Sequence, residues 1–368
     1  MSPRVNRRLT LTSHAIIISV GSGHDPRALE RYRPHVTAKL SENPAYGFAV
    51  GRIRALEASL LDRTRYERLI LAKSGEDFAA ALVETAYARF LQESSSDVPK
   101  ALEMASRDNT TFLSQYALDP WLLDLLRLPD AFRRLKADLK RSLAGNGTAV
   151  ALPAELGGEP SAARVTVTVA EVTADFSRDH DPAAVDMAVD KTEHALLMEA
   201  SSVNEFVTAY LRLHADVENL RTLVRMKLQP GDGGERDREA KLANAFLAGG
   251  TLDRKALAAA LTEPWEVVFD RFAKGPPQGV GGELYRDYLE QGIAAVRDRR
   301  TFLRMERLGR ELELRFLRRT RYATFGCEPL VAFFLFRENE LRNLRQLYAA
   351  KLAGVSPETA QDLVAYAE

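Results

Sequence analysis

The chain has 368 residues, of which 46% are hydrophobic and 28% are charged, as is ordinary for a globular protein. Lys and Arg number 51, as do Asp and Glu, so the formal net charge is zero, which argues against a dedicated nucleic-acid binder. The single cysteine, Cys327, excludes a disulfide framework and a cysteine-rich zinc site.

The N-terminal segment carries the first apolar stretch of the chain. Its longest apolar run, Ala15–Val20, is far shorter than the roughly 20 residues needed to cross a bilayer. Ser13 and His14 interrupt the stretch and no small-residue cleavage site follows, so we expect a cytoplasmic chain without signal peptide or membrane span. Leu9–Val20 is rich in β-branched residues, which predicts a strand.

Helical spacing dominates from Tyr46 onward, because apolar residues recur at three- and four-residue steps. Pro129 is expected in a first helical turn, and Ser356 as the N-cap of a short last helix. Ser94–Ser96 and the Gly- and Pro-rich stretches 145–160, 229–235 and 275–282 are predicted breaks. The other expected helices are 46–61, 78–90, 121–128, 131–143, 183–198, 203–228, 283–317 and 329–353.

One segment inside this helical pattern has strand character. Arg164–Val172 reads RVTVTVAEV, with valines at every second position of its first half. Paired with Leu9–Val20, it would form a small β patch. A helix is the alternative, because intrinsic propensity is a weak guide that tertiary packing overrides.

An internal repeat is the most informative feature of the sequence. DVENLRTLVRMKL (Asp216–Leu228) and ELRNLRQLYAAKL (Glu340–Leu352) share six identities at a constant offset of 124 residues. A weaker copy, FRRLKADLKRSL, lies at Phe132–Leu143. A repeat of this length exceeds the 20–50 residues of solenoid units, so it indicates domains arranged around a common axis. Chance similarity between two amphipathic helices is the alternative.

At these residues the sequence resembles the C subunit of the rotary V/A-type ATPases, which is the counterpart of the d subunit of the eukaryotic V-type enzymes. The resemblance runs from about Tyr46 to the end of the chain. It rests on the order and spacing of several blocks: Tyr46–Leu61, Leu82–Leu91, Asp216–Leu228 and Phe336–Glu358.

The resemblance implies an all-α, funnel-shaped fold of three similar helical domains around a pseudo-threefold axis. We expect an N-terminal extension at 1–45 and helical repeats at 46–145, 146–250 and 251–368. It also implies a non-catalytic rotor subunit, peripheral to the membrane, that couples the central shaft (the D and F subunits) to the membrane proteolipid ring. It implies neither a nucleic-acid partner nor a direct membrane span.

The sequence offers no convincing chemical site. Gly21-Ser22-Gly23 lacks the third glycine of a dinucleotide fingerprint, and no Walker A sequence occurs. His214 and Glu218 have metal-ligand spacing but no third ligand, and Cys327 at a helix start is expected to be a small packed residue. We therefore expect no catalytic, cofactor-binding or metal site.

A socket for the shaft would need polar, donor-rich residues, because the free subunit must stay soluble. The candidates are the basic positions of the repeated helix, and solvated outer-face residues are the alternative reading for each. They are Lys136, Lys140, Arg221, Arg225 and Arg345.

Two other functions compete with the rotor subunit. Arg297–Arg321 contains ten arginines against four acidic residues, which would suit a helical nucleic-acid-binding protein. An enzyme with a small-molecule site between domains is the third hypothesis. The zero net charge weighs against the former, and the missing catalytic constellation against the latter.

Overall fold

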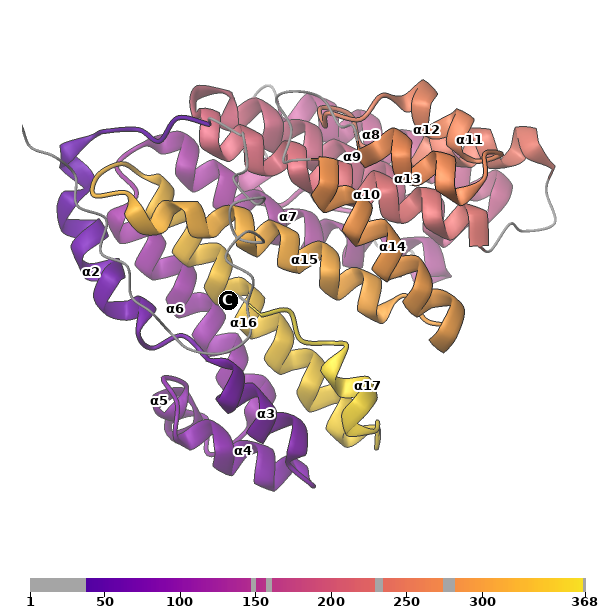
Figure 1. Cartoon of the computed structure of the whole chain (residues 1–368). Coiled ribbons are helices and arrows are strands. Elements are labelled where there is room, and N and C mark those ends of the chain that lie inside the picture. The colour runs from indigo at the N-terminus through magenta and orange to yellow at the C-terminus, as the bar shows by residue number, and fades with distance from the viewer. Residues whose placement is uncertain (1–37, 147–149, 157–160, 229–233, 274–281, 367–368) are drawn as a thin grey trace, which may run out of the picture. The chain divides into compact units, whose positions relative to one another are not determined.

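The computed structural model describes residues 38–146, 150–156, 161–228, 234–273 and 282–366. Within these ranges every regular element is a helix, which confirms the predicted all-α fold class (Figure 1). The described residues all belong to one contact unit, His35–Glu368.

The α-helices are α2 (Gly47–Glu57), α3 (Arg63–Leu71), α4 (Gly75–Val83), α5 (Ala88–Glu93), α6 (Val98–Tyr116), α7 (Pro120–Arg141), α8 (Ser161–Asp179), α9 (Pro182–Ala200), α10 (Glu205–Leu228), α11 (Glu235–Ala245), α12 (Arg254–Ala260), α13 (Trp265–Ala273), α14 (Gly282–Arg299), α15 (Leu303–Leu317), α16 (Glu328–Leu352) and α17 (Pro357–Gln361). Short 3-10 or π turns are η1 (Pro44–Tyr46), η2 (Ser142–Asn146), η3 (Ala154–Leu156), η4 (Ser201–Val203) and η5 (Arg318–Tyr322).

Three long helices, α7, α10 and α16, begin in one shared hydrophobic cluster. Leu122, Val207 and Val331 stand near their starts, and all three are at most 1% exposed. Val207 and Val331 are separated by the 124 residues of the sequence repeat, and Leu122 precedes Val207 by 85. Burying an apolar side chain at the corresponding place of each helix holds the three starts together.

Polar residues join the starts of α10 and α16. The buried carboxylate of Glu328 accepts hydrogen bonds from the side-chain amide of Asn204 (2.9 Å) and from the backbone N–H of Ser41 (2.7 Å). Asn204 and Glu328 are themselves 124 residues apart, so corresponding residues of the repeat meet here. These donors are needed because a buried charge without partners is costly.

Beyond this junction each long helix packs its C-terminal half into different surroundings. Leu341, Leu344 and Leu347 of α16 pack among α3 to α6. Residues 128–139 of α7 pack against α8 and α9, whereas residues 220–224 of α10 pack among α12, α14 and α15. A threefold axis that relates three similar domains stays a prediction.

The two stronger copies of the repeat make the same contacts with the backbone. The side-chain amide of Asn219 donates to the carbonyl of Leu247 and accepts from its N–H, both at 2.9 Å. Asn343 makes the same reciprocal pair with Ala365, at 2.9 and 3.3 Å. The shared Asn-Leu-Arg therefore has a structural role, because each asparagine fixes a loop against its helix.

At two further positions of the repeat, one acidic and one basic, the two copies make equivalent contacts. Asp216 and Glu340 are buried, and each accepts a hydrogen bond from a backbone N–H just before a short helix and from a tyrosine hydroxyl. Lys227 and Lys351 each donate to carbonyl oxygens at the C-terminal end of that short helix. The short helices are α12 and α3, which both begin after Leu-Asp, and the tyrosines are Tyr285 and Tyr87.

The strand expected at Arg164–Val172 is wrong, because this segment belongs to α8. Val165 and Val172 are buried seven residues apart, whereas Val167 is 56% exposed, so one face of a helix packs on α9. The Thr166 hydroxyl donates to the carbonyl four residues earlier (2.7 Å), a bond that only a helix offers. The other half of the expected β patch, Leu9–Val20, lies outside the described residues.

Expected helices are also divided or joined differently at three places. The helix expected at 78–90 is two helices, α4 and α5, because residues 84–87 form a turn between them. The long helix expected at 283–317 is divided into α14 and α15 at Arg300, whose φ of +55° breaks the α-helix. Pro129 lies inside α7 rather than in a first turn. The two helices expected on either side of it are therefore one, and the ring of Pro129 removes a hydrogen bond from its middle. Ser356 caps α17 as expected, by accepting from the Thr359 N–H.

Candidate partner-binding surfaces

The two lysines predicted as partner contacts lie on α7 and face α9. Lys136 forms an ion pair with Asp190, and Lys140 forms one with Asp186 at 2.8 Å. All four side chains are partly exposed. Exposed ion pairs contribute about 0–1 kcal/mol each, so both lysines are able to exchange these partners for others.

The three predicted arginines have different partners, one on the same helix and two on neighbouring helices. Arg221 pairs with Glu218 of its own helix, and Arg225 pairs with Glu306 of α15 at 3.6 Å. Arg345 donates to the Leu102 carbonyl of α6 at 3.5 Å. The structure thus distributes the five predicted residues over three neighbourhoods, each already engaged within the chain.

Arg221 and Glu218 line a cavity of about 260 Å³ between α10, α14, α15 and α16. Here His214 Nδ1 lies 2.7 Å from the Glu313 carboxylate. Burial alone would lower the pKa of His214, but the Glu313 carboxylate outweighs burial and raises that pKa to about 9. A raised pKa favours the charged form of His214, which pairs with Glu313 in this cavity.

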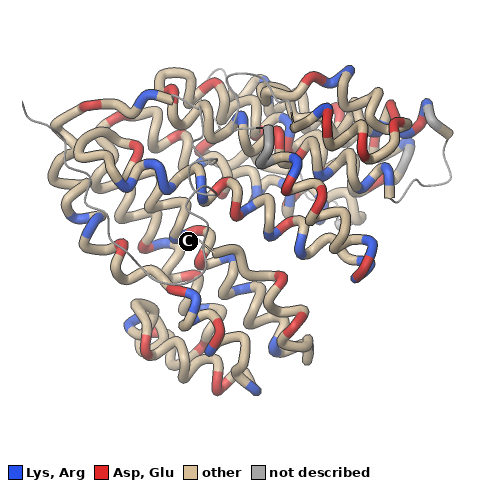
Figure 2. Tube along the Cα trace, in the orientation of Figure 1, with Lys and Arg blue, Asp and Glu red and all other residues tan. Residues whose placement is uncertain are grey.

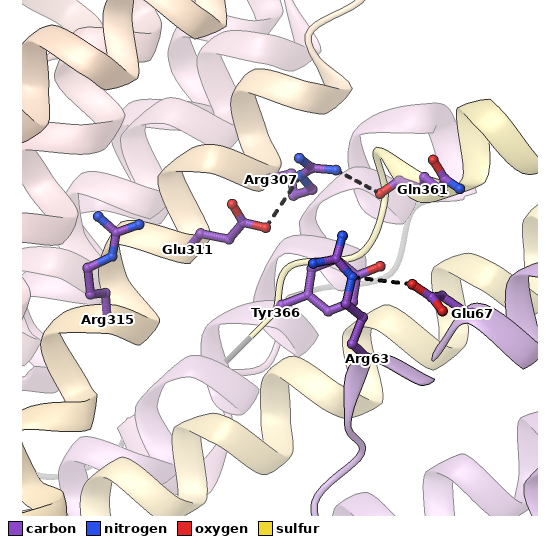
Figure 3. A pocket seen from close by; sticks show the side chains of 7 residues that line it. All are labelled: Arg63, Glu67, Arg307, Glu311, Arg315, Gln361 and Tyr366. Carbon is purple, nitrogen blue, oxygen red and sulfur yellow. Dashed lines mark hydrogen bonds and ion pairs between the residues drawn. The ribbon is translucent and has the colours of Figure 1, made fainter. Parts of the chain in front are cut away.

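A second cavity, of about 320 Å³, lies between α3, α15 and the C-terminal segment (Figure 3). Arg63 pairs with Glu67 at 3.3 Å on α3, and Arg307 pairs with Glu311 at 3.4 Å on α15. Burial raises the pKa of Glu311, and Arg307 opposes this effect. Arg315, one turn beyond Glu311, is exposed and makes no hydrogen bond or ion pair with the residues that the structure describes.

A third cavity, of about 330 Å³, continues from the second, because Arg63 and Tyr366 line both. It extends along η5 to Arg321, which is exposed and stacks on the Tyr322 ring at 5.4 Å. Its apolar lining includes Leu60 and Phe336. We call the joined second and third cavities the arginine groove; its basic residues are Arg63, Arg307, Arg315, Arg318 and Arg321.

The arginine-rich segment 297–321 supplies four of the five arginines of the groove, which the sequence alone does not predict. Many of its arginines serve the chain itself: Arg299 pairs with Asp362, and Arg310 donates to the Leu363 carbonyl at 2.8 Å. Burial lowers the pKa of Arg310 to about 10. Figure 2 shows basic and acidic residues interleaved along the traced helices, as the internal ion pairs of this segment require.

The residues considered for chemistry in the sequence have different surroundings in the structure. Among the residues that the structure describes, no group of three or more His, Cys, Asp or Glu is placed to hold a metal ion. Cys327 is buried, and burial together with the Glu328 carboxylate raises the pKa of its thiol to about 12. That thiol stays protonated at neutral pH. Gly21-Ser22-Gly23 lies outside the described residues.

The extent of the similarity to known proteins decides the family. The model of the ATP synthase (C/AC39) subunit matches residues 49–363, a range that includes all three long helices. The chain belongs to this family. The ATP synthase (C/AC39) subunit is a component of the V/A-type ATPases, so the resemblance found in the sequence is confirmed.

Two further findings accompany the family assignment. Among the curated proteins none matches the chain. Of the helices that the structure describes, none in this ATP synthase (C/AC39) subunit has the length and apolar character to cross a bilayer.

Proposed function

We propose that this protein is a non-catalytic subunit of the central rotor in a V/A-type ATPase or ATP synthase. It connects the D–F shaft to the membrane proteolipid ring and couples their rotation to the transport of a proton or sodium ion. The match to the ATP synthase (C/AC39) subunit over residues 49–363 carries this proposal. In this proposal the protein is peripheral to the membrane and is held there only through the complex.

We also propose the domain organisation that this role implies. Residues 46–145, 146–250 and 251–368 would form three similar helical domains around a pseudo-threefold axis, after an extension at 1–45. The common start of α7, α10 and α16 in one cluster supports an axis at that place. A socket around the axis would then present corresponding residues of three helices to the shaft.

Lys136, Arg221 and Arg345 hold corresponding positions, 85 and 124 residues apart, and are the proposed contacts together with Lys140 and Arg225. Their present partners are weak competitors, because the ion pairs of Lys136, Arg221 and Arg225 are partly exposed to solvent. Carboxylates of the shaft can replace them at small cost. Charged contacts of this kind mainly accelerate association, and salt screens them over about 8–10 Å.

The test is a binding titration of the purified chain with the D–F shaft at low and high salt. The double variant that carries both Arg221→Glu and Arg345→Glu should associate more slowly and bind the shaft about tenfold more weakly, with its helical content unchanged. Arg254→Glu with Lys255→Glu is the control, because both side chains are exposed on α12 and it changes the charge equally. If neither salt nor the Arg221/Arg345 double variant changed the affinity for the shaft, the socket would lie elsewhere on the protein.

The non-catalytic role has its own measurement. The purified chain should neither bind nor hydrolyse ATP, because no phosphate-binding loop with its lysine occurs in the sequence. Turnover that a single cavity substitution abolishes would contradict the proposal. Capture of the chain from its native cell with nucleotide-binding subunits and a proteolipid would support it.

A further inference from the structure

We propose that the arginine groove between α3, α15 and η5 is a docking site for an extended, acidic segment of a partner polypeptide. The groove is separate from the five residues proposed to meet the shaft, and its role does not depend on the rotor function. Three features of the groove carry the proposal: its excess of one basic side chain, its apolar lining and the acidic residues between its arginines.

The groove has one more basic than acidic side chain, because five arginines and four carboxylates line it. Each acidic side chain that lines it already has a partner. Arg315 acts on the Glu311 carboxylate only at longer range, and among the described residues neither Arg315 nor Arg321 forms an ion pair or hydrogen bond with a carboxylate; both are exposed. The partnered acids are Glu57 with Arg54, Asp62 with the Arg65 N–H, Glu67 with Arg63, and Glu311 with Arg307. A ligand with carboxylates would supply what Arg315 and Arg321 lack, with the planar geometry that guanidinium groups bind bidentately.

The apolar lining gives such a ligand more than charge to bind. Leu60 is half-buried and Phe336 is 6% exposed, and both line the part of the groove next to η5. The Tyr366 ring lies beneath the Arg63 guanidinium at 5.4 Å, where both parts of the groove meet (Figure 3). Tyr322, 82% exposed, stands at the rim beside Arg321. Exposed aromatic and arginine side chains are the residue types that dominate binding at protein interfaces.

The interleaved acidic residues favour a polypeptide over a nucleic acid. Glu67 and Glu311 lie on opposite walls of the cavity (Figure 3). A phosphate backbone carries one negative charge per nucleotide, so carboxylates at this spacing would repel it. An extended peptide instead presents backbone N–H groups that can donate to these carboxylates between its acidic side chains. The groove therefore matches a chain of alternating charge and hydrogen-bond donors.

The experiment uses the purified full chain and a fluorescein-labelled peptide of Glu-Gly repeats, with binding followed by fluorescence anisotropy. Gln-Gly repeats are the uncharged control peptide. We expect the Glu-Gly peptide to bind, the Gln-Gly peptide not to bind, and Arg315→Glu with Arg321→Glu to weaken binding about tenfold, or roughly threefold for each exposed charge pair. Arg254→Glu with Lys255→Glu, which makes the same charge change on α12, should alter the affinity less than about twofold.

A benzophenone group on the same peptide locates the bound ligand. Cross-links should map to Tyr366, Leu60 or Phe336, which are the larger apolar and aromatic side chains lining the part of the groove next to η5. Equal effects of the two charge-reversal variants, or cross-links confined to other helices, would overturn the proposal. So would a single-stranded oligonucleotide that binds through Arg315 and Arg321 more tightly than the peptide does, because the groove would then be a nucleic-acid site.

Discussion

Replacing Lys227 by Met should loosen the end of one helix in a way that the structure quantifies. The Lys227 ammonium donates to the carbonyl oxygens of Ala260 (2.8 Å), Leu261 (3.0 Å) and Glu263 (2.8 Å), and lies 4.8 Å from the centre of the Trp265 ring. All three of its donors are satisfied at the C-terminal end of α12, where a positive charge also complements the helix dipole. Methionine preserves the length of the side chain but offers no donor.

The expected cost is about 2 kcal/mol. A hydrogen bond to a charged group contributes roughly 1.5–3 kcal/mol when buried, but the bonds of Lys227 are only partly buried, so water replaces part of this contribution. Lys351, the corresponding residue of α16, donates to a single carbonyl, that of Ile70. Lys351→Met should therefore cost about 1 kcal/mol or less, and it is the matched control.

Urea denaturation measures which of the two variants loses more free energy of unfolding. Hydrogen exchange shows which helix end is loosened in each. Lys227→Met should raise the exchange of amides in 257–261, and Lys351→Met should affect only the end of α3. If both variants lost equal stability, or if α12 exchanged no faster in Lys227→Met, the three-carbonyl contact would not be what stabilises this end of the helix.

Three other substitutions test separate parts of the molecule. His214→Gln should lower the free energy of unfolding by about 1 kcal/mol at pH 6, after allowance for solvent screening, and should have no effect at pH 10. Glu313 raises the pKa of His214 in the folded state to about 9, so the ion pair stabilises the fold fully below the ordinary pKa of about 6.5 and no longer does so once the pH rises through 9. The midpoints of urea denaturation at both pH values measure this difference. Gly309→Ala should cost about 1–3 kcal/mol, because its Cβ would lie 2.7 Å from Val217 Cγ1; a lowered Tm would show this, and an unchanged Tm would mean that the helices separate freely. Glu340→Ala should cost about 3–5 kcal/mol and expose α3 to proteolysis, and Glu340→Gln should protect it better.

The repeat could be recognised in the sequence because its residues make specific polar contacts. Asn219 and Asn343 are buried amides with reciprocal backbone partners, and such positions tolerate few replacements. Leu220 and Leu344 are fully buried beside them. The pattern therefore persisted in both copies, whereas the weaker copy has Arg134 at this position, where it pairs with Glu155 on the surface.

The period of a short segment was a poorer guide. In α8, alternate valines suggested a strand, but the residues that the fold buries are Val165 and Val172. The remaining β-branched residues are mostly exposed, and Thr166 satisfies its hydroxyl on its own helix. When a segment fits both the two-residue period of a strand and the period of a helix, the elements that pack on it determine which structure it adopts. Here α8 packs on α9, and the local pattern contains no information about that contact.

The break that divides the helix predicted at 283–317 could not be predicted from the local sequence either. Nothing in the residue type of Arg300 demands a φ of +55°, since arginine is a good helix former. Beyond this break α15 crosses α10 closely enough that Gly309 meets Val217. The break therefore accompanies the packing of α15 on α10, which the residue types around Arg300 do not signal.

The charge that this protein offers to a partner cannot be read from the sequence alone. A count of arginines in 297–321 gives a strong excess, yet Arg299, Arg307 and Arg310 are engaged with the C-terminal segment or with α15 itself. The charge available to a partner is what remains after such internal pairs, and in the arginine groove it resides on Arg315 and Arg321. For a chain with zero net charge, binding therefore depends on which ion pairs the fold leaves incomplete, and those are found only when the helices are placed side by side.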